Sequence, residues 1–232
     1  MRDKICMTGK LDDIRAEIDN LDAELRAGLL RRAELVAQIA AAKAAHNDAA
    51  MPLRPMREMQ QMRALRAWQQ ADAPMLSGAG LTAIWREIIG MALSQQGGMS
   101  IYASPSAFAT ARAHFGASLT YESAPNDLAE LADKQRAIAV LSLSEATPPP
   151  DGMAVFARLP FDEKGDAVTC LCYGAQIDED PIAAGGVYLV RRQAALAGDN
   201  IVFDGDDYVL VETRQPENDA IWGRYLTLEN AS

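Results

Sequence analysis

The feature that most constrains the fold is a long apolar seam near the start of the chain that no proline interrupts. Its apolar residues recur every three or four positions, the near-heptad spacing of one helix face: Leu11, Ile14, Ile18, Leu21, Leu25 and Leu29. No proline lies between Met1 and Met51, and Gly28 is the only glycine within the pattern. We therefore predict one helix from about Leu11 to His46, roughly 54 Å long at about 1.5 Å per residue.

Two shorter helical patterns follow after a proline-rich break. Pro55 fits the first turn of a second helix, whose apolar positions continue to Trp68. After a second break at 78–80, a third helix is predicted from Leu81 to Leu93. Because the long helix cannot bury its seam against these two helices alone, we expect it to pack against another long helix in a homodimer.

The composition changes sharply at Gly97 and Gly98, which would end the third helix. All five Phe and all six Tyr lie from Ser100 onward, whereas nine of the ten Met lie in residues 1–99. Residues 1–98 hold 13 Lys and Arg against 12 Asp and Glu, and residues 99–232 hold 9 against 20. Because aromatic residues favour strands, we predict a helical domain over 1–98 and a small α/β domain over 99–232.

Composition also excludes several classes of protein. The chain has 232 residues, of which 49% are hydrophobic, so it can bury a sizeable core. Its net charge of -10 opposes general binding to nucleic acid. There is no apolar run of a length that spans a membrane, and residues 1–10 lack the apolar stretch of a signal peptide. We expect a soluble, cytoplasmic protein that uses neither membrane nor nucleic acid as a partner.

The polar residues on the helical faces suggest a binding pocket for a small dianion. Arg15 lies beside the apolar seam, and Arg32 and Lys43 are eleven residues apart, so both point the same way from one helix. Glu58 opens the second helix and Gln96 closes the third. Any one of these cations could be part of a solvated face. Together, with few acidic partners, they suit two carboxylates. Without a nucleophile grouping or metal-ligand spacing, such a pocket would bind and polarise, and we expect no metal and no cofactor.

These residues stand in a recognisable order. The strings 11–22 and 29–35, then Lys43, then Arg57 with Glu58, and finally 84–89 with Gln96 resemble the all-helical, type II chorismate mutases. The resemblance covers residues 11–96. It implies a three-helix protomer that intertwines as a homodimer, with two active sites built from both chains. It also implies the rearrangement of chorismate to prephenate on the shikimate route to Phe and Tyr, an isomerase reaction that needs no cofactor.

The resemblance assigns a role to each residue of the pocket. Arg15 would reach across the dimer to one substrate carboxylate, and Arg32 would bind a carboxylate within its own chain. Lys43 and Gln96 would donate to the ether oxygen, where negative charge grows as the C–O bond breaks. Glu58 would accept a hydrogen bond from the ring hydroxyl.

Three further positions line the pocket in the family pattern. Arg57 would lie at the same end as Glu58. Arg54 stands where many members have an Asp that caps the second helix, and an arginine has no side-chain oxygen for that purpose. Ala92 stands where a Ser often contacts a carboxylate. Neither change removes a donor to the ether oxygen, so we expect activity to survive them.

The second domain alternates predicted strands and helices. We predict strands at 100–103, 137–143, 168–173, 187–191 and 208–212, and helices at 106–115 and 127–134. Residues 100–144 weakly resemble the start of a prephenate dehydratase domain. The segment Ser142–Ala146 stands where an Asn-Ser-Thr-type motif is expected, and no Thr-Arg-Phe triplet occurs. This implies a degenerate, inactive relative that serves as an accessory domain.

Three functions are compatible with this sequence. The first is a chorismate mutase dimer. The second is an isochorismate-pyruvate lyase, an activity that arises on the same helices. The long loop 44–51 and the presence of Glu58 favour the mutase. The third is a non-catalytic protein that senses a metabolite through residues 100–232.

Overall fold

The structure is a computed structural model that describes residues 2–46, 51–134, 136–161, 168–175, 180–193, 195–196, 200–205, 208–216 and 220–227. The chain divides into two compact units, Met1–Asp48 and Ala49–Ser232. The domain boundary predicted near residue 98 stays a prediction. Within the described residues, no helix is both long and apolar enough to cross a membrane.

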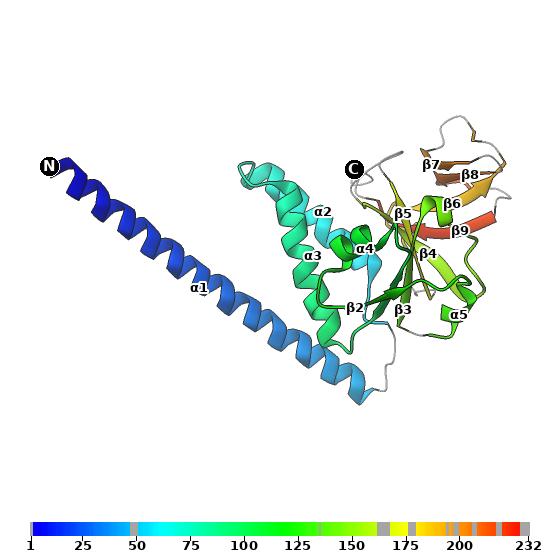
Figure 1. Cartoon of the computed structure of the whole chain (residues 1–232), viewed down its shortest axis with the longest axis horizontal. Coiled ribbons are helices and arrows are strands. Elements are labelled where there is room, and N and C mark those ends of the chain that lie inside the picture. The colour runs from blue at the N-terminus through cyan, green and yellow to red at the C-terminus, as the bar shows by residue number, and fades with distance from the viewer. Residues whose placement is uncertain are drawn as a thin grey trace. The chain divides into compact units, whose positions relative to one another are not determined.

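The first unit consists of one helix, α1 (Arg2–Ala45), which confirms the predicted long helix and extends it toward the N-terminus (Figure 1). Lys43 lies in its last turn, where the helix dipole favours a cation. The seam side chains are 42–66% exposed within this chain, namely Leu11, Ile14, Ile18, Leu21, Leu25 and Leu29. The first unit, a single helix, therefore has no core of its own in which to bury this face.

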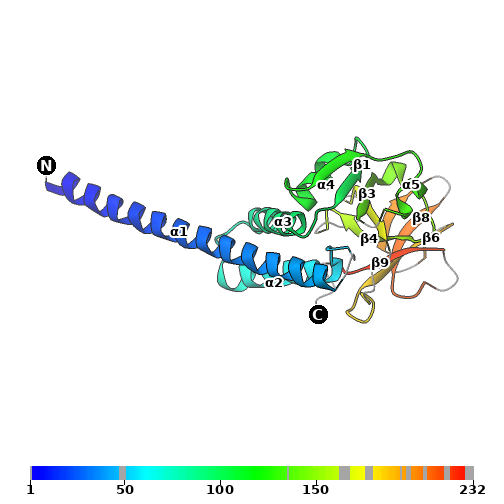
Figure 2. The ribbon, with the colours of Figure 1, turned by 90° about the horizontal axis from the view of Figure 1, so that it is seen from below.

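The second unit begins with a helical hairpin, α2 (Pro55–Asp72) and α3 (Gly78–Gln95), which run side by side (Figures 1 and 2). Pro55 occupies the first turn of α2, as predicted. The predicted start of α3 near Leu81 was too late. The Ser77 hydroxyl accepts a hydrogen bond from the Gly80 amide at 3.2 Å, and this N-cap starts the helix despite two glycines in its first turn.

The rest of the second unit contains a nine-stranded sheet in the order β2-β1-β3-β5-β4-β9-β6-β8-β7. Strand β1 is parallel to both β2 and β3, β4 is parallel to β9, and the remaining registered pairs are antiparallel. The strands are β1 (Ser100–Ala103), β2 (Thr120–Ser123), β3 (Ala137–Ser142), β4 (Met153–Leu159), β5 (Cys170–Ala175), β6 (Val187–Arg192), β7 (Asn200–Asp204), β8 (Val209–Thr213) and β9 (Ala220–Tyr225).

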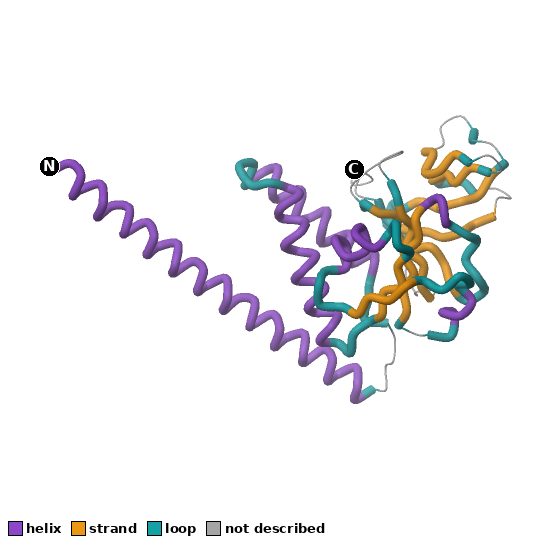
Figure 3. Tube along the Cα trace, viewed as in Figure 1, coloured by secondary structure: helices purple, strands orange, loops and turns teal. Residues whose placement is uncertain are grey.

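The described residues of this unit also form two short helices and a 3-10 turn. They are α4 (Phe108–Phe115), α5 (Ala129–Ala132) and η1 (Leu143–Glu145). Gly116 ends α4 with a φ of 83°, a conformation that glycine adopts without strain. The predicted strands correspond to β1, β3, β5, β6 and β8, and the predicted helices to α4 and a shorter α5. The predicted class, a helical segment followed by an α/β sheet domain, is confirmed (Figure 3).

The two faces of the sheet are covered differently. On one face, α2, α3 and α4 bury a cluster that joins helix residues such as Met62 and Leu93 to strand residues such as Ile138. On the other face, α5 and the bent far half of the sheet enclose a second cluster, in which Leu171 and Leu210 both take part. Because the hairpin shares a core with the strands, residues 55–95 are fixed relative to the sheet.

Close contact between α3 and α4 strengthens this connection. A Cβ placed on Gly90 would collide with the carbonyl oxygen of Phe115, so only glycine allows α3 to approach the end of α4 this closely. The Glu87 carboxylate then accepts a hydrogen bond from the Ala117 amide at 3.0 Å. The hairpin that carries several predicted site residues is therefore held by both packing and hydrogen bonds.

Candidate functional site

Three of the predicted site residues lie on α1. The Arg15 guanidinium donates to the Asp12 carboxylate at 3.1 Å, and the two side chains are 73% and 62% exposed. Arg32 and Lys43 lie farther along the helix. Eleven residues separate these two, about 16 Å along the axis but only about 20° around it, so long side chains at both positions can converge on one small molecule.

Arg15 and Arg32 are too far apart on α1 to serve one small substrate. Their offset of seventeen positions in sequence corresponds to about 26 Å along the helix axis. This spacing exceeds the reach of two arginine side chains around a molecule the size of chorismate. If both arginines bind substrate, they act in different sites.

In the second unit, Glu58 forms a buried ion pair with Arg86. Arg86 Nη1 donates to Glu58 Oε2 at 3.1 Å, and the two side chains are only 4% and 12% exposed. The Arg86 guanidinium also lies 4.4 Å from the centre of the Phe161 ring, within cation–π range. Glu58 is thus held at a fixed place near the start of α2, against the middle of α3.

Arg86 is the functional neighbour that sequence reasoning did not identify. The buried positions of α3 include Arg86, Ile89, Gly90 and Leu93, at spacings of three, four and seven residues. Extending the apolar stripe of α3 backward by one turn would have placed Arg86 in the core. A buried arginine requires an acidic partner, so placing Arg86 in the core would have led to the search that finds Glu58.

Arg54 and Arg57 lie close in sequence to Glu58 but are used differently. Arg54 Nη1 donates to the carbonyl oxygens of Met51 and Leu53, at 2.9 and 3.3 Å. It therefore stabilises the loop before α2, and α2 has no side-chain N-cap bond, as predicted from the missing Asp. Arg57 is exposed on α2.

Ala92 and Gln96 lie near the end of α3. Ala92 is buried, and its carbonyl oxygen accepts a hydrogen bond from Gln96 Nε2 at 3.2 Å. The Gln96 carbonyl oxygen in turn accepts from Arg136 Nη1 at 3.1 Å. Gln96 lies ten residues after Arg86, about 15 Å farther along α3.

His114 adds a titratable group next to the Glu58–Arg86 pair. Its ring packs edge-on against the rings of Phe115 and Phe161, with centroids 4.7 and 5.7 Å away. Burial, with the nearby Arg86 charge as a second cause, lowers the pKa of His114 well below its ordinary value of 6.5. The imidazole is therefore neutral near pH 7, and Glu58 retains Arg86 as its cationic neighbour.

Five of the predicted site residues lie on one helical hairpin, and the other three lie in the other unit. Glu58, Arg54, Arg57, Ala92 and Gln96 share the helical hairpin of the second unit. The cations of α1 belong to the first unit. The assembly of the complete set into one site stays a prediction.

A second polar cluster lies at the carboxyl ends of the parallel strands β1 and β3. The Glu145 carboxylate accepts hydrogen bonds from Ser106 at 2.8 Å and from Ser142 at 2.5 Å, and Ser104 and Ser144 extend the network. Hydrogen bonding by the hydroxyls of Ser104, and then of Ser142 and Ser106, lowers the pKa of Glu145 to about 2. The chain's own carboxylate therefore engages the hydroxyls at the place of the predicted degenerate dehydratase motif.

The described side chains include no group of three His, Cys, Asp or Glu that could hold a metal ion. Cys170 and Cys172 are buried free thiols. Their neighbours are apolar members of the core on the helical side of the sheet.

Comparison with known families identifies the helical part of the chain. Residues 14–97 match the model of the chorismate mutase type II family, and this stretch contains every predicted site residue from Arg15 to Gln96. No curated protein and no solved structure matched the chain. The resemblance of residues 100–144 to a dehydratase stays a prediction, because the match ends at residue 97. From within α1 to just past the end of α3, the chain is therefore similar to the chorismate mutase type II family.

Proposed function

We propose that this protein is a chorismate mutase, an isomerase that converts chorismate to prephenate in the synthesis of aromatic amino acids. The observation that carries this proposal is the family match over residues 14–97. The residues to which the resemblance assigns roles all fall inside this match, namely Arg15, Arg32, Lys43, Glu58 and Gln96.

The chemistry of the reaction fits these side chains. Chorismate carries two carboxylates, and its rearrangement is one concerted step without a nucleophile. Arginines at the two carboxylates would hold the folded chair conformer, which lowers the entropic part of the barrier. Lys43 and Gln96 would donate to the ether oxygen, which gains negative charge as its bond to carbon breaks.

The working unit in this proposal is a homodimer with shared sites. The axial spacing of Arg15 and Arg32, about 26 Å, supports two different sites for the two arginines of one helix. The exposed seam of α1 supplies an apolar surface for a second copy. Each site would then contain Arg32 and Lys43 of one chain and Arg15 of the other.

Glu58 has two tasks in this proposal. Its pairing with Arg86 fixes the position of the carboxylate. A carboxylate has about four lone-pair positions, so it can also accept a hydrogen bond from the ring hydroxyl of the substrate. Arg86 is therefore a positioning residue for Glu58.

The test is steady-state conversion of chorismate to prephenate by the full chain, with Lys43→Ala as the variant. Losing one preorganised donor to the ether oxygen should lower kcat by about 100- to 1,000-fold. Lys10→Ala, an exposed lysine on the same helix, is the matched control and should keep the parent rate. A Lys43→Ala protein that turns over chorismate at the parent rate would show that the site is assigned wrongly.

The same assay separates the alternatives. Salicylate and pyruvate formed from isochorismate, without prephenate from chorismate, would identify a lyase. Binding of either compound without turnover would identify a sensor.

A further inference from the structure

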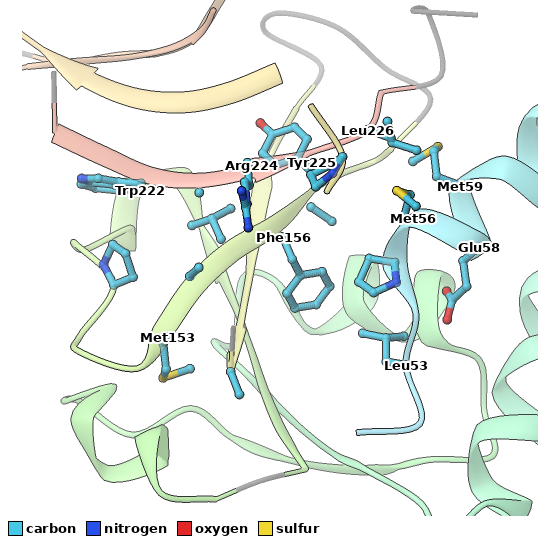
Figure 4. Close-up of a pocket in the computed structure, with 18 of the residues that line it drawn as sticks. Leu53, Met56, Glu58, Met59, Met153, Phe156, Trp222, Arg224, Tyr225 and Leu226 are labelled. Carbon is cyan, nitrogen blue, oxygen red and sulfur yellow. The ribbon is translucent and has the colours of Figure 1, made fainter. Parts of the chain in front are cut away.

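A pocket of about 370 Å³ lies within the second unit, where strands β4 and β9 meet near the start of α2 (Figure 4). The two strands are registered at one pair, Val155 and Gly223. A Cβ on Gly223 would collide with the Val155 carbonyl oxygen, so glycine is what allows the strands to touch there. We call this cavity the seam pocket.

The walls of the seam pocket are mostly apolar. Met56 and Met59 come from α2, Phe156 from β4, and Leu226 from the end of β9. Methionine side chains adapt to the shape of a ligand, and the Phe156 ring offers a flat surface. The volume lies within the range of small-molecule sites, about 300–1,000 Å³.

One cation in the seam pocket remains available for a ligand. Arg224 lies on β9 among the apolar side chains (Figure 4). Across the described part of the chain, its guanidinium has no hydrogen bond or ion pair. The other arginine of the pocket, Arg86, is paired with Glu58. The Tyr225 hydroxyl is already engaged, since it donates to a Glu212 oxygen at 3.0 Å.

The charged side chains of the pocket also determine which ligands it disfavours. Asp151 also lines the pocket, and Arg86 is already paired with Glu58, so a second anionic group on a ligand would meet repulsion from Asp151. A dianion such as chorismate therefore fits poorly. A ligand with one anionic group at Arg224 and an apolar body against Phe156 matches both the charge and the walls.

We propose that the seam pocket is a binding site for a small monoanion with an apolar ring or chain, held by Arg224 and by the side chains of Met56 and Phe156. This pocket shares Glu58 with the proposed mutase site, but the binding of a monoanion at Arg224 does not depend on mutase activity. Because Glu58 belongs to the pocket wall, an occupant also touches the first turns of α2. Any effect of an occupant on chorismate turnover, unlike the binding itself, rests on the proposed function.

The test uses Trp222, which lines the pocket, as a reporter. In the full chain, Trp68→Phe and Trp85→Phe leave Trp222 as the only tryptophan. This protein is titrated with 4-phenylbutyrate and with uncharged 4-phenylbutanol while Trp222 emission is recorded. The proposal predicts saturable binding of the carboxylate at least about 10-fold tighter than that of the alcohol, as a charge-assisted hydrogen bond provides.

Two variants of this single-tryptophan protein test whether Arg224 binds the carboxylate. Arg224→Gln should remove the preference for the carboxylate and leave weak binding of both compounds. Arg112→Gln changes an exposed arginine on α4 and should keep the preference. Equal binding of the two compounds by the parent, an unchanged preference in Arg224→Gln, or no saturable signal from Trp222 would each overturn the proposal.

Discussion

The seam of α1 and the sheet of the second unit differ in how far they bury their apolar side chains. Leu25 in the seam of α1 is 66% exposed, whereas Ile138 at the centre of the sheet is fully buried. Their ion pairs differ in the same sense, because Arg15–Asp12 is solvated and Arg86–Glu58 is enclosed. The sheet of the second unit buries its own core, whereas the first unit, a single helix, has no core in which to bury the seam. An isolated helix gains little stability from its own residues, so we expect packing of the seam to stabilise α1.

The largest expected effect comes from placing a charge in the seam of α1. Leu25→Asp should dissociate the proposed dimer, because burial of leucine contributes about 1.5–3 kcal/mol in each of two chains. Sedimentation equilibrium over a concentration series measures the dissociation constant. Loss of the dimer should also abolish chorismate turnover, since each proposed site uses two chains.

The control for this change is Ala23→Asp, which puts the same charge on the opposite face of α1. It should leave the dissociation constant close to that of the parent. A Leu25→Asp protein that stays dimeric with parent affinity would show that the seam is not the contact between copies.

The next largest effect is expected from removing one member of the buried ion pair, compared with removing one member of the exposed pair. Arg86→Ala removes the charged partner of Glu58 from a buried position, which typically costs about 3–5 kcal/mol. Asp12→Ala removes the exposed pair on α1 and should cost less than about 1 kcal/mol. Urea unfolding of both variants measures the free energies. Similar losses for the two would contradict the difference in burial.

A smaller effect is expected from pH. The folded-state pKa of His114 is lowered, so below pH 6.5 the unfolded chain binds a proton that the folded chain does not. Stability contributed by neutral His114 is therefore complete above about pH 6.5 and falls with decreasing pH, by at most about 1.4 kcal/mol per pH unit.

Replacing His114 with Gln should flatten this part of the curve of unfolding free energy against pH. His46, the other histidine of the chain, is exposed just after the end of α1, and His46→Gln serves as the matched control. An equally steep loss below pH 6.5 in the His114→Gln protein would assign the effect to other groups.

Much of the fold was predictable because local sequence patterns indicate its helices and strands. The apolar period of α1 and the proline at the start of α2 define those helices, and apolar runs define strands such as β3. Strands β2, β4, β7 and β9 were missed. Strand β4 contains a bulge at Phe156, and β9 contains Gly223, so neither shows clean alternation.

The candidate site was predictable in its residue types but not in its contacts. Glu58 and Gln96 stand at helix ends that the sequence predicts. Arg86 is 28 residues from Glu58, and their pairing depends on how α2 and α3 fold back on each other. The seam pocket depends on a contact between β4 and β9, which are far apart in sequence, and no local pattern indicates it.

The most direct test of the account is subunit mixing of two inactive variants. Arg15→Ala and Arg32→Ala homodimers should each be nearly inactive in the prephenate assay. After exchange, a heterodimer has one site with both arginines and one with neither, so it should recover about half of the parent activity. No recovery, after mass spectrometry has verified the heterodimer, would show that both arginines act within one chain and would contradict the shared site.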